Sequence, residues 1–151
     1  MVNYITHGDI FKIKDVFNYA HGCNCAGAMG KGIALQFKKK YPKMYIEYKN
    51  LCKSGKFNLG DVFQYKYDKG YVFNLGTQKH WRTRAKLNAI EESIDRMLCF
   101  ASKNNIDKIS LPKIGAGLGG LNWDDVKQII EKVNAKYPLI KLFVVENYIK
   151  I

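Results

Sequence analysis

Two glycine-rich segments hold the residues best suited to chemistry. The first, residues 21–34, reads HGCNCAGAMGKGIA, and the second, residues 112–121, contains G-x-G-x-x-G at Gly115, Gly117 and Gly120. Each follows a predicted strand and precedes a predicted helix, where free backbone N–H groups and the helix dipole attract anions. Two such loops at one edge of a sheet predict a ligand that carries a diphosphate.

Neither segment fits the common nucleotide-binding motifs. A Walker A loop would need glycine where Cys25 stands, and Ser or Thr rather than Gly32 after Lys31. A Rossmann fingerprint opens a dinucleotide domain, but only about thirty residues follow Gly120. The alternative is structural, since left-handed turns and close helix packing also select glycine. One loop alone would not decide between the two; the pair favours a phosphate site.

The elements that would position these loops alternate along the chain. Apolar and β-branched runs predict strands at 2–6, 17–21, 62–67, 71–75, 108–111 and 140–145. Apolar residues three or four apart predict a helix over 85–103, and a second helix should start at the N-cap Asn122 and end before Pro138. A helical pair spans 32–53, broken near Pro42, and Gly70 turns the middle strands into a hairpin. This order predicts an α/β fold, a mixed sheet with helices on both faces.

The composition indicates one globular domain with an anionic partner. The 151 residues hold 25 Lys and Arg against 13 Asp and Glu, a formal charge of +12. Nucleic acid or phosphate is therefore a candidate partner, with a cluster of Lys38, Lys39, Lys40 and Lys43 near Tyr41 and Tyr45 as its site. The alternative is a lysine-rich surface that reflects coding bias alone.

Cysteine usage and the ends of the chain give expectations about cofactors and location. Cys23, Cys25, Cys52 and Cys99 form no CxxC pair and have no His at zinc-ligand spacing, so we expect reduced thiols and no metal. No signal peptide or spanning segment is recognisable, and we expect a cytoplasmic monomer without membrane contact.

The chain resembles the macro domains, which bind ADP-ribose. The motifs that carry the resemblance are THGDI at 6–10, MGKGIA at 29–34, LPKIGAGL at 111–118 and the last strand, in the order of the family. The segment NLGTQKHWR at 74–82 is similar to the antitoxin branch that removes ADP-ribose from DNA. Nearly the whole chain is covered. The resemblance implies a single macro domain over 1–151 with a three-layer α/β/α architecture and a mixed central sheet.

The same resemblance implies how adenine would be held. Asp9 would accept a hydrogen bond from the adenine amino group while the Ile10 backbone touches the ring, and Asn147 or Tyr148, after the last strand, would flank it. The alternatives are that Asp9 caps a turn and that Tyr148 belongs to the edge of the core.

The resemblance also implies contacts to the rest of ADP-ribose. Asn24 would hold the distal ribose, although it could instead hydrogen-bond its own loop. The remaining contacts would come from the two loops: Gly30, Gly32 and Ile33 at the distal ribose, and Gly115, Ala116, Gly117, Leu118 and Gly119 around the diphosphate.

The catalytic positions differ from those of the hydrolases in this branch. Those enzymes place Lys directly after the strand-ending Thr, where this chain has Gln78, with Lys79 one residue later. The glycohydrolase carries Asp where this chain has Gly119. Lys79 and His21 are the candidates that remain, His21 as a general acid or base at the lip of the first loop; each has a structural alternative. We rank His7 and His80 lower.

Three functions remain open on this basis. The first is hydrolysis at the terminal ribose without metal or cofactor, which releases ADP-ribose from phosphate or from a modified macromolecule. The second is a non-catalytic reader of ADP-ribose, suggested by Gln78 and Gly119. The third is a basic module that faces nucleic acid. The sequence does not distinguish a 1″-phosphate from an ester or a base-linked substrate.

Overall fold

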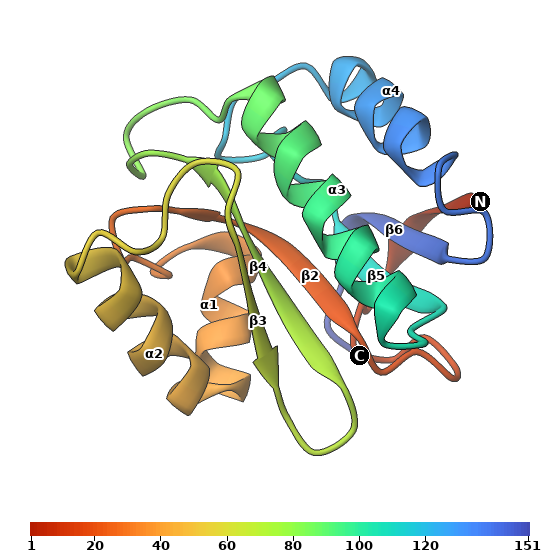
Figure 1. The fold of residues 1–151 in the computed structure, drawn as a ribbon, viewed down its shortest axis with the longest axis horizontal. Helices are drawn as coiled ribbons and strands as arrows, with labels where there is room; N and C mark the ends of the chain where they lie inside the picture. Colours follow the sequence, from red (N-terminus) through yellow and green to blue (C-terminus); the bar gives the residue numbers. More distant parts are fainter.

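A six-stranded sheet between two helical layers forms the molecule (Figure 1). The computed structural model describes residues 1–151. The strands are β1 (Val2–Gly8), β2 (Tyr19–Asn24), β3 (Val62–Lys66), β4 (Tyr71–Gln78), β5 (Lys108–Pro112) and β6 (Lys141–Tyr148). The helices are α1 (Gly32–Lys40), α2 (Pro42–Lys53), α3 (Leu87–Lys103) and α4 (Trp123–Asn134). No helix has the length and apolar character needed to cross a membrane.

The strand order β1-β6-β5-β2-β4-β3 brings distant segments to one edge of the sheet. All neighbouring pairs are parallel except β3 and β4, which form the predicted antiparallel hairpin. The carboxyl ends of β2, β4 and β5 therefore lie together, and in sheets of this kind ligands bind at that edge. Both glycine-rich segments follow strands that end there.

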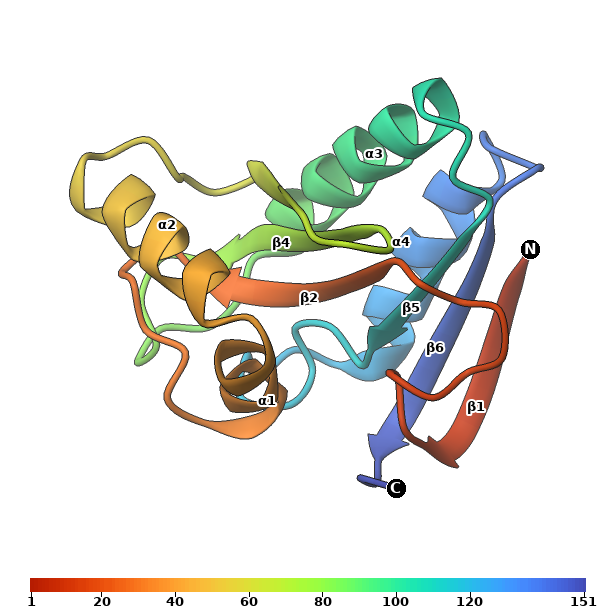
Figure 2. The ribbon, with the colours of Figure 1, turned by 90° about the horizontal axis from the view of Figure 1, so that it is seen from below.

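The two faces of the sheet bury different cores because successive side chains of a strand point to opposite faces. Phe73 and Leu75 join α3 and α4 in one core, whereas Val72 joins α1 and α2 in the other. Val144 and Val145 divide in the same way. Figure 2 shows α1 and α2 on one side of the sheet and α3 and α4 on the other. The predicted α/β/α layering is confirmed.

Strands β2 and β5 separate soon after they meet. Their pairing consists of Tyr19 opposite Ser110, with the Ser110 N–H donating to the Asn18 carbonyl at 2.9 Å. By contrast, β2 pairs with β4 along its whole length, from Tyr19 to Asn24, with one register shift after Cys23. In Figure 2, β2 turns away from β5 toward the carboxyl edge. The sheet thus opens between the two strands that carry the glycine-rich loops.

Most predicted elements are confirmed, with corrections at strand ends. The helical pair breaks at Tyr41 and Pro42 as expected, and Asn122 is the N-cap of α4. Strand β2 begins and ends later than the predicted 17–21, while β4 continues to Gln78 and β6 to Tyr148. The extensions follow from parallel pairing with neighbours, which tolerates polar residues near the exposed edge of the sheet.

The cap of α4 gives a stability prediction. The Asn122 Oδ1 accepts hydrogen bonds from the N–H groups of Asp124 at 2.9 Å and Asp125 at 3.4 Å. We expect Asn122→Ala to lower the free energy of unfolding by about 1 kcal/mol, the usual value of such a cap. Urea denaturation measures it. Asn88→Ala, at an exposed position of α3, is the control and should change stability little; equal losses in both variants would contradict the capping role.

Candidate functional site

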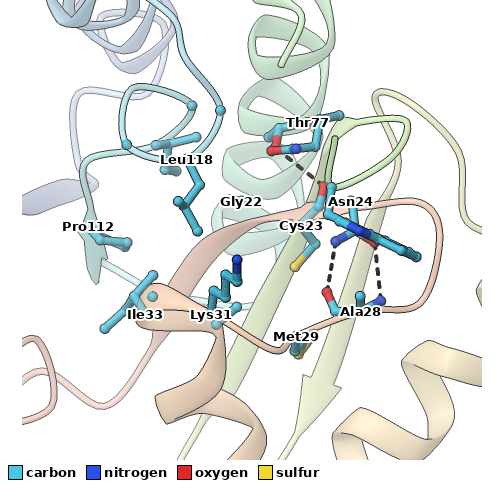
Figure 3. Close-up of a pocket in the computed structure, with 18 of the residues that line it drawn as sticks. Gly22, Cys23, Asn24, Ala28, Met29, Lys31, Ile33, Thr77, Pro112 and Leu118 are labelled. Carbon is cyan, nitrogen blue, oxygen red and sulfur yellow. Dashed lines mark hydrogen bonds between the residues drawn. The ribbon is translucent and has the colours of Figure 1, made fainter. Parts of the chain in front are cut away.

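A cavity of about 540 Å³ occupies the opening between β2 and β5. Four segments form its wall: the end of β2, the first loop with the start of α1, the end of β4 with Trp81 after it, and the second loop from Pro112 onward. The lining residues are Gly22, Cys23, Asn24, Ala28, Met29, Gly30, Lys31, Gly32, Ile33, Ala34, Thr77, Gln78, Trp81, Pro112, Lys113, Ile114, Gly115, Gly117, Leu118 and Gly119. Figure 3 shows the two loops facing each other across this space. The predicted convergence of the loops is therefore present.

Asn24 builds the first loop from within. Its Nδ2 donates to the Ala28 carbonyl at 2.8 Å, and its Oδ1 accepts from the Ala28 N–H at 3.2 Å (Figure 3). The same Oδ1 accepts from the Ala26 N–H at 3.0 Å. The Tyr48 hydroxyl lies 2.6 Å from the Asn24 carbonyl and 3.0 Å from its Oδ1. These contacts support the alternative interpretation, in which Asn24 shapes its own loop while lining the cavity.

The start of α1 faces the cavity without a cap. The N-cap residue Lys31 makes no side-chain cap hydrogen bond, and the first turn holds no acidic residue. Gly32, Ile33 and Ala34 line the cavity, so the N–H groups of this turn are at its wall. The Lys31 side chain extends toward the space between Gly22 and Leu118 (Figure 3). The arrangement suits an anionic group.

The second loop owes part of its glycine content to its own geometry. Gly115 has φ +70°, and a Cβ there would lie 2.6 Å from the Ile90 Cδ1. A Cβ at Gly119 would lie 2.6 Å from the Gly115 carbonyl oxygen. This backbone contact excludes an Asp at Gly119 in the present loop conformation. The backbone conformation of the second loop therefore accounts for the glycine at position 119, where the glycohydrolase has Asp.

Gly30 and Gly117 have no such structural reason to be glycine. Neither has a positive φ, and a Cβ at either position would meet no atom within 4 Å. Both are exposed and both line the cavity, one in each loop. A side chain at these positions would occupy the space from which a ligand would approach the backbone. The fold alone therefore does not require glycine at either position.

Few ionisable groups reach the cavity. Lys31 and Lys113 line it, together with Cys23, whose thiol pKa is raised well above its usual value by burial. No carboxylate or imidazole is part of the wall, and nowhere in the molecule do three His, Cys, Asp or Glu side chains gather as metal ligands. The cavity is consequently cationic, in agreement with a diphosphate ligand.

His21 lies inside the core rather than at the lip of the loop, which corrects the expected position. Its ring is fully buried in mid-β2, stacked on Phe37 at 3.9 Å, with Nε2 2.6 Å from the Asn74 Oδ1. Asn74 in turn donates to the Phe63 carbonyl at 3.0 Å. Burial lowers the pKa of His21 from 6.5 to about 4. A neutral imidazole outside the cavity wall does not fit the predicted role in acid–base catalysis.

Lys79 is exposed and also lies outside the cavity wall. Gln78, at the position of the lysine in the related hydrolases, lines the cavity, but its Nε2 donates to the carbonyls of His80 at 3.0 Å and Thr83 at 3.1 Å. The one-residue shift is thus not absorbed by the loop. Gln78 serves as a tie within the segment that follows β4.

The residues predicted to hold adenine lie beyond the cavity, at the ends of β1 and β6. Asp9 and Ile10 are buried, and the Asp9 carboxylate accepts from the N–H groups of Phe11 at 2.9 Å and Ile151 at 3.0 Å. Asn147 and Tyr148 belong to β6 instead of following it, a correction that reflects their pairing with β1. Because β1, β6 and β5 are parallel, these residues share the carboxyl edge with the cavity.

The two tyrosines of the predicted basic cluster are engaged in contacts within the fold. Tyr41 is buried in the core beneath α1 and α2. The Lys38 Nζ lies 4.4 Å from the centre of the Tyr45 ring, and the Tyr45 hydroxyl donates to the Gly27 carbonyl at 3.2 Å. Tyr41 is therefore not available to stack on a base, while the half-buried Tyr45 is held by these two contacts.

The sequence analysis missed several cavity residues. Trp81, Lys31 and Lys113 line the cavity but were not among the predicted site residues, and Ala116, which was, does not line it. Their positions could have identified them, because each lies in a segment that follows a strand ending at the carboxyl edge of the sheet. At that edge a lysine can contact a phosphate group and a tryptophan can stack on a base.

Residues 20–130 match the family model of the macro domain. The chain belongs to the macro domain family. This macro domain is 37% identical over 129 residues to a DNA ADP-ribosyl glycohydrolase of Thermus aquaticus, covering 82% of this chain and 35% of that protein. It is 32% identical over 126 residues to human ADP-ribose glycohydrolase OARD1, covering 83% of this chain and 80% of that protein.

Solved structures agree with the family assignment. The macrodomain of Mycobacterium tuberculosis DarG superimposes on this macro domain with a TM-score of 0.88 at 33% identity, covering 97% of each chain. The chain spans little more than a third of the length of the Thermus aquaticus relative. The similarity therefore concerns the macrodomain alone, and both of these relatives are named as glycohydrolases.

The buried imidazole gives a prediction about stability and pH. The unfolded chain binds a proton at His21 below about pH 6.5, whereas the folded chain binds it only below about pH 4, so stability is lost as the pH falls through this window. At about 1.4 kcal/mol per pKa unit, the loss from His21 approaches about 3 kcal/mol at pH 4. His21→Gln keeps a donor for Asn74 and does not titrate. Urea denaturation from pH 7 to pH 4 should show the stabilities of wild type and variant converging; a constant difference would contradict the burial of neutral His21.

Proposed function

We propose that the cavity binds ADP-ribose, with the diphosphate between the uncapped start of α1 and the second loop. The observation that carries this proposal is the pair Gly30 and Gly117, whose missing side chains leave the cavity wall open on both sides. The cations Lys31 and Lys113 supply the matching charge. Adenine would extend along the sheet edge toward Asp9, whose carboxylate would exchange the Ile151 N–H for the adenine amino group.

We further propose that this macro domain removes ADP-ribose from DNA. The names of the relatives and the residues 74–82 support this assignment. In the reaction, water adds to the anomeric carbon of the terminal ribose, the bond to the base breaks, and the base keeps the electron pair and takes up a proton. Because no carboxylate or imidazole lines the cavity, the diphosphate of the substrate orients the water while Lys31 and loop N–H groups stabilise developing negative charge.

A non-catalytic reader is the second candidate. It is favoured by the cavity wall itself, in which Gln78 is engaged in loop hydrogen bonds and Gly119 leaves no room for a carboxylate. A reader needs only the binding geometry, which both candidates share. The two differ in turnover alone.

Two glycine substitutions test the binding site. We expect Gly30→Ala and Gly117→Ala to leave the melting temperature unchanged or slightly higher, because each removes freedom from the unfolded chain without a clash. Each should nevertheless weaken ADP-ribose binding about tenfold or more, a cost of about 1.4 kcal/mol, because the methyl group occupies the ligand's approach. Calorimetric titration measures the affinity. Gly119→Ala is the contrasting variant, expected to lose stability; unchanged affinity in the first two variants would refute the proposed diphosphate site.

Turnover separates the two candidate functions. Wild-type protein should release ADP-ribose from an ADP-ribosylated single-stranded oligonucleotide, and chromatography measures this release. Lys31→Ala should lower kcat/KM about tenfold, which is equivalent to about 1.4 kcal/mol of transition-state stabilisation. Lys79→Ala should retain the kcat of wild type. Tight binding without release would establish the reader, and loss of activity in Lys79→Ala with retention in Lys31→Ala would return the catalytic role to Lys79.

A further inference from the structure

The segment between β4 and α3, residues 79–86, is held rigidly beside the cavity. Its turn is closed by the Gln78 amide, which bonds the carbonyls of His80 and Thr83, and by the Thr83 N–H, which donates to His80 at 3.1 Å. The Lys86 N–H donates to the Thr77 carbonyl at 2.9 Å. We call residues 79–86 the β4–α3 loop.

This loop is also joined to the second glycine loop. The Ala85 N–H donates to the Gly119 carbonyl at 2.9 Å, and the Arg84 Nη2 donates to the Gly120 carbonyl at 2.8 Å. The Arg84 side chain is therefore engaged in holding the two loops together. The position of the β4–α3 loop relative to the cavity is fixed on both sides, so whatever it exposes stands at a defined place at the cavity wall.

What it exposes is an indole. Trp81 is 51% exposed, lines the cavity, and rests on the His80 ring at a centroid distance of 3.7 Å. Phe17 is the other Phe, Tyr or Trp in the exposed class, and it precedes β2 at the opposite edge of the sheet. A half-exposed tryptophan that stacks on an imidazole at the surface contributes little to the stability of the hydrophobic core. Its geometry is that of a stacking platform.

The surroundings of Trp81 are cationic. Between Lys69 and Ile90 the chain contains no Asp or Glu, and two of its three arginines lie in the β4–α3 loop. Lys79, Arg82 and Lys86 are exposed, and none of them forms a salt bridge. Exposed cations around an aromatic platform match the alternation of phosphates and bases in a single strand, whose bases are free to stack.

We infer that the β4–α3 loop binds the DNA strand that carries the ADP-ribosyl group, with a base stacked on Trp81 and backbone phosphates beside Arg82 and Lys86. This inference rests on the proposed function. The ADP-ribosyl group fills the cavity, and the strand remains outside, where the loop meets it. The β4–α3 loop therefore determines which macromolecule is recognised, while the two glycine-rich loops determine the specificity for ADP-ribose.

Trp81 variants test the platform. The probe is a fluorescent ten-nucleotide DNA strand with one ADP-ribosyl group, titrated by anisotropy, or by initial rates as KM if turnover intervenes. Trp81→Ala should raise the Kd or KM at least about fivefold, the lower end of the range for loss of one base stack. Trp81→Phe should retain most of the affinity. Phe17→Ala, which removes the other exposed aromatic residue, should bind like wild type.

A second experiment measures how strongly binding of the same strand depends on salt concentration. Arg82→Ala should reduce the slope of log Kd against log salt concentration by about 0.7, the contribution of one phosphate contact to a single strand. Lys141→Ala, an exposed cation at the amino end of β6, is the matched control and should leave the slope unchanged. An unchanged slope in Arg82→Ala would remove this residue from the strand contact.

Binding of free ADP-ribose distinguishes failure of this inference from failure of the proposed function. If Trp81→Ala weakens binding of the modified strand at least about threefold more than it weakens binding of free ADP-ribose, the platform is supported. If both ligands weaken equally, Trp81 belongs to the ADP-ribose pocket and the inference is wrong. If neither ligand is affected, the platform is also wrong. If wild type binds no ADP-ribose, the proposed function itself fails.

Discussion

The single residue pair between β2 and β5 is the constraint on which the site depends. A sheet normally gains a ladder of hydrogen bonds along each pair of strands, and here that ladder is abandoned after Tyr19 and Ser110. The strands must then hold their positions by other means. On one side β2 keeps its register with β4, and on the other β5 keeps its register with β6. Because β2 and β5 do not pair beyond this point, an opening remains between them, and both glycine-rich loops border it.

The buried polar residues near the opening are explained by the same constraint. His21, Asn74 and the Phe63 carbonyl form a chain of hydrogen bonds across β2, β4 and β3 on the face covered by α1. Buried polar groups are stable only when they are satisfied, and a satisfied network fixes one arrangement. Asn24 and Tyr48 do the same for the loop that follows β2. His21 and Asn74 thus maintain the geometry of a cavity that they do not line, whereas Asn24 both shapes and lines it.

Periodicity and turn residues predicted the fold well, because alternation in strands, the helix face of 85–103, and the signals at Pro42, Gly70 and Asn122 are local properties of the chain. Strand ends were less predictable, because parallel neighbours extended β4 to Gln78 and β6 to Tyr148. The bounds of β2 were also misplaced, at 17–21 rather than Tyr19–Asn24, which put His21 at the end of its strand instead of in the middle. Its alternation with Tyr19 and Cys23 was the available signal that it points into a core. The site was predictable as two converging loops, whereas Trp81 and the hydrogen bonds of Gln78 depend on tertiary contacts.

The attachment of the β4–α3 loop has an evolutionary consequence. Its anchors are the backbone N–H groups of Ala85 and Lys86, together with the side chains of Gln78 and Arg84, whereas Trp81 and Arg82 contribute no side-chain bond to the rest of the fold. Residues between the anchors can therefore be exchanged without disturbing the cores or the glycine loops. A macro domain of this design is modular: the two glycine-rich loops form the cavity, and the few residues between the anchors of the β4–α3 loop can change without altering it.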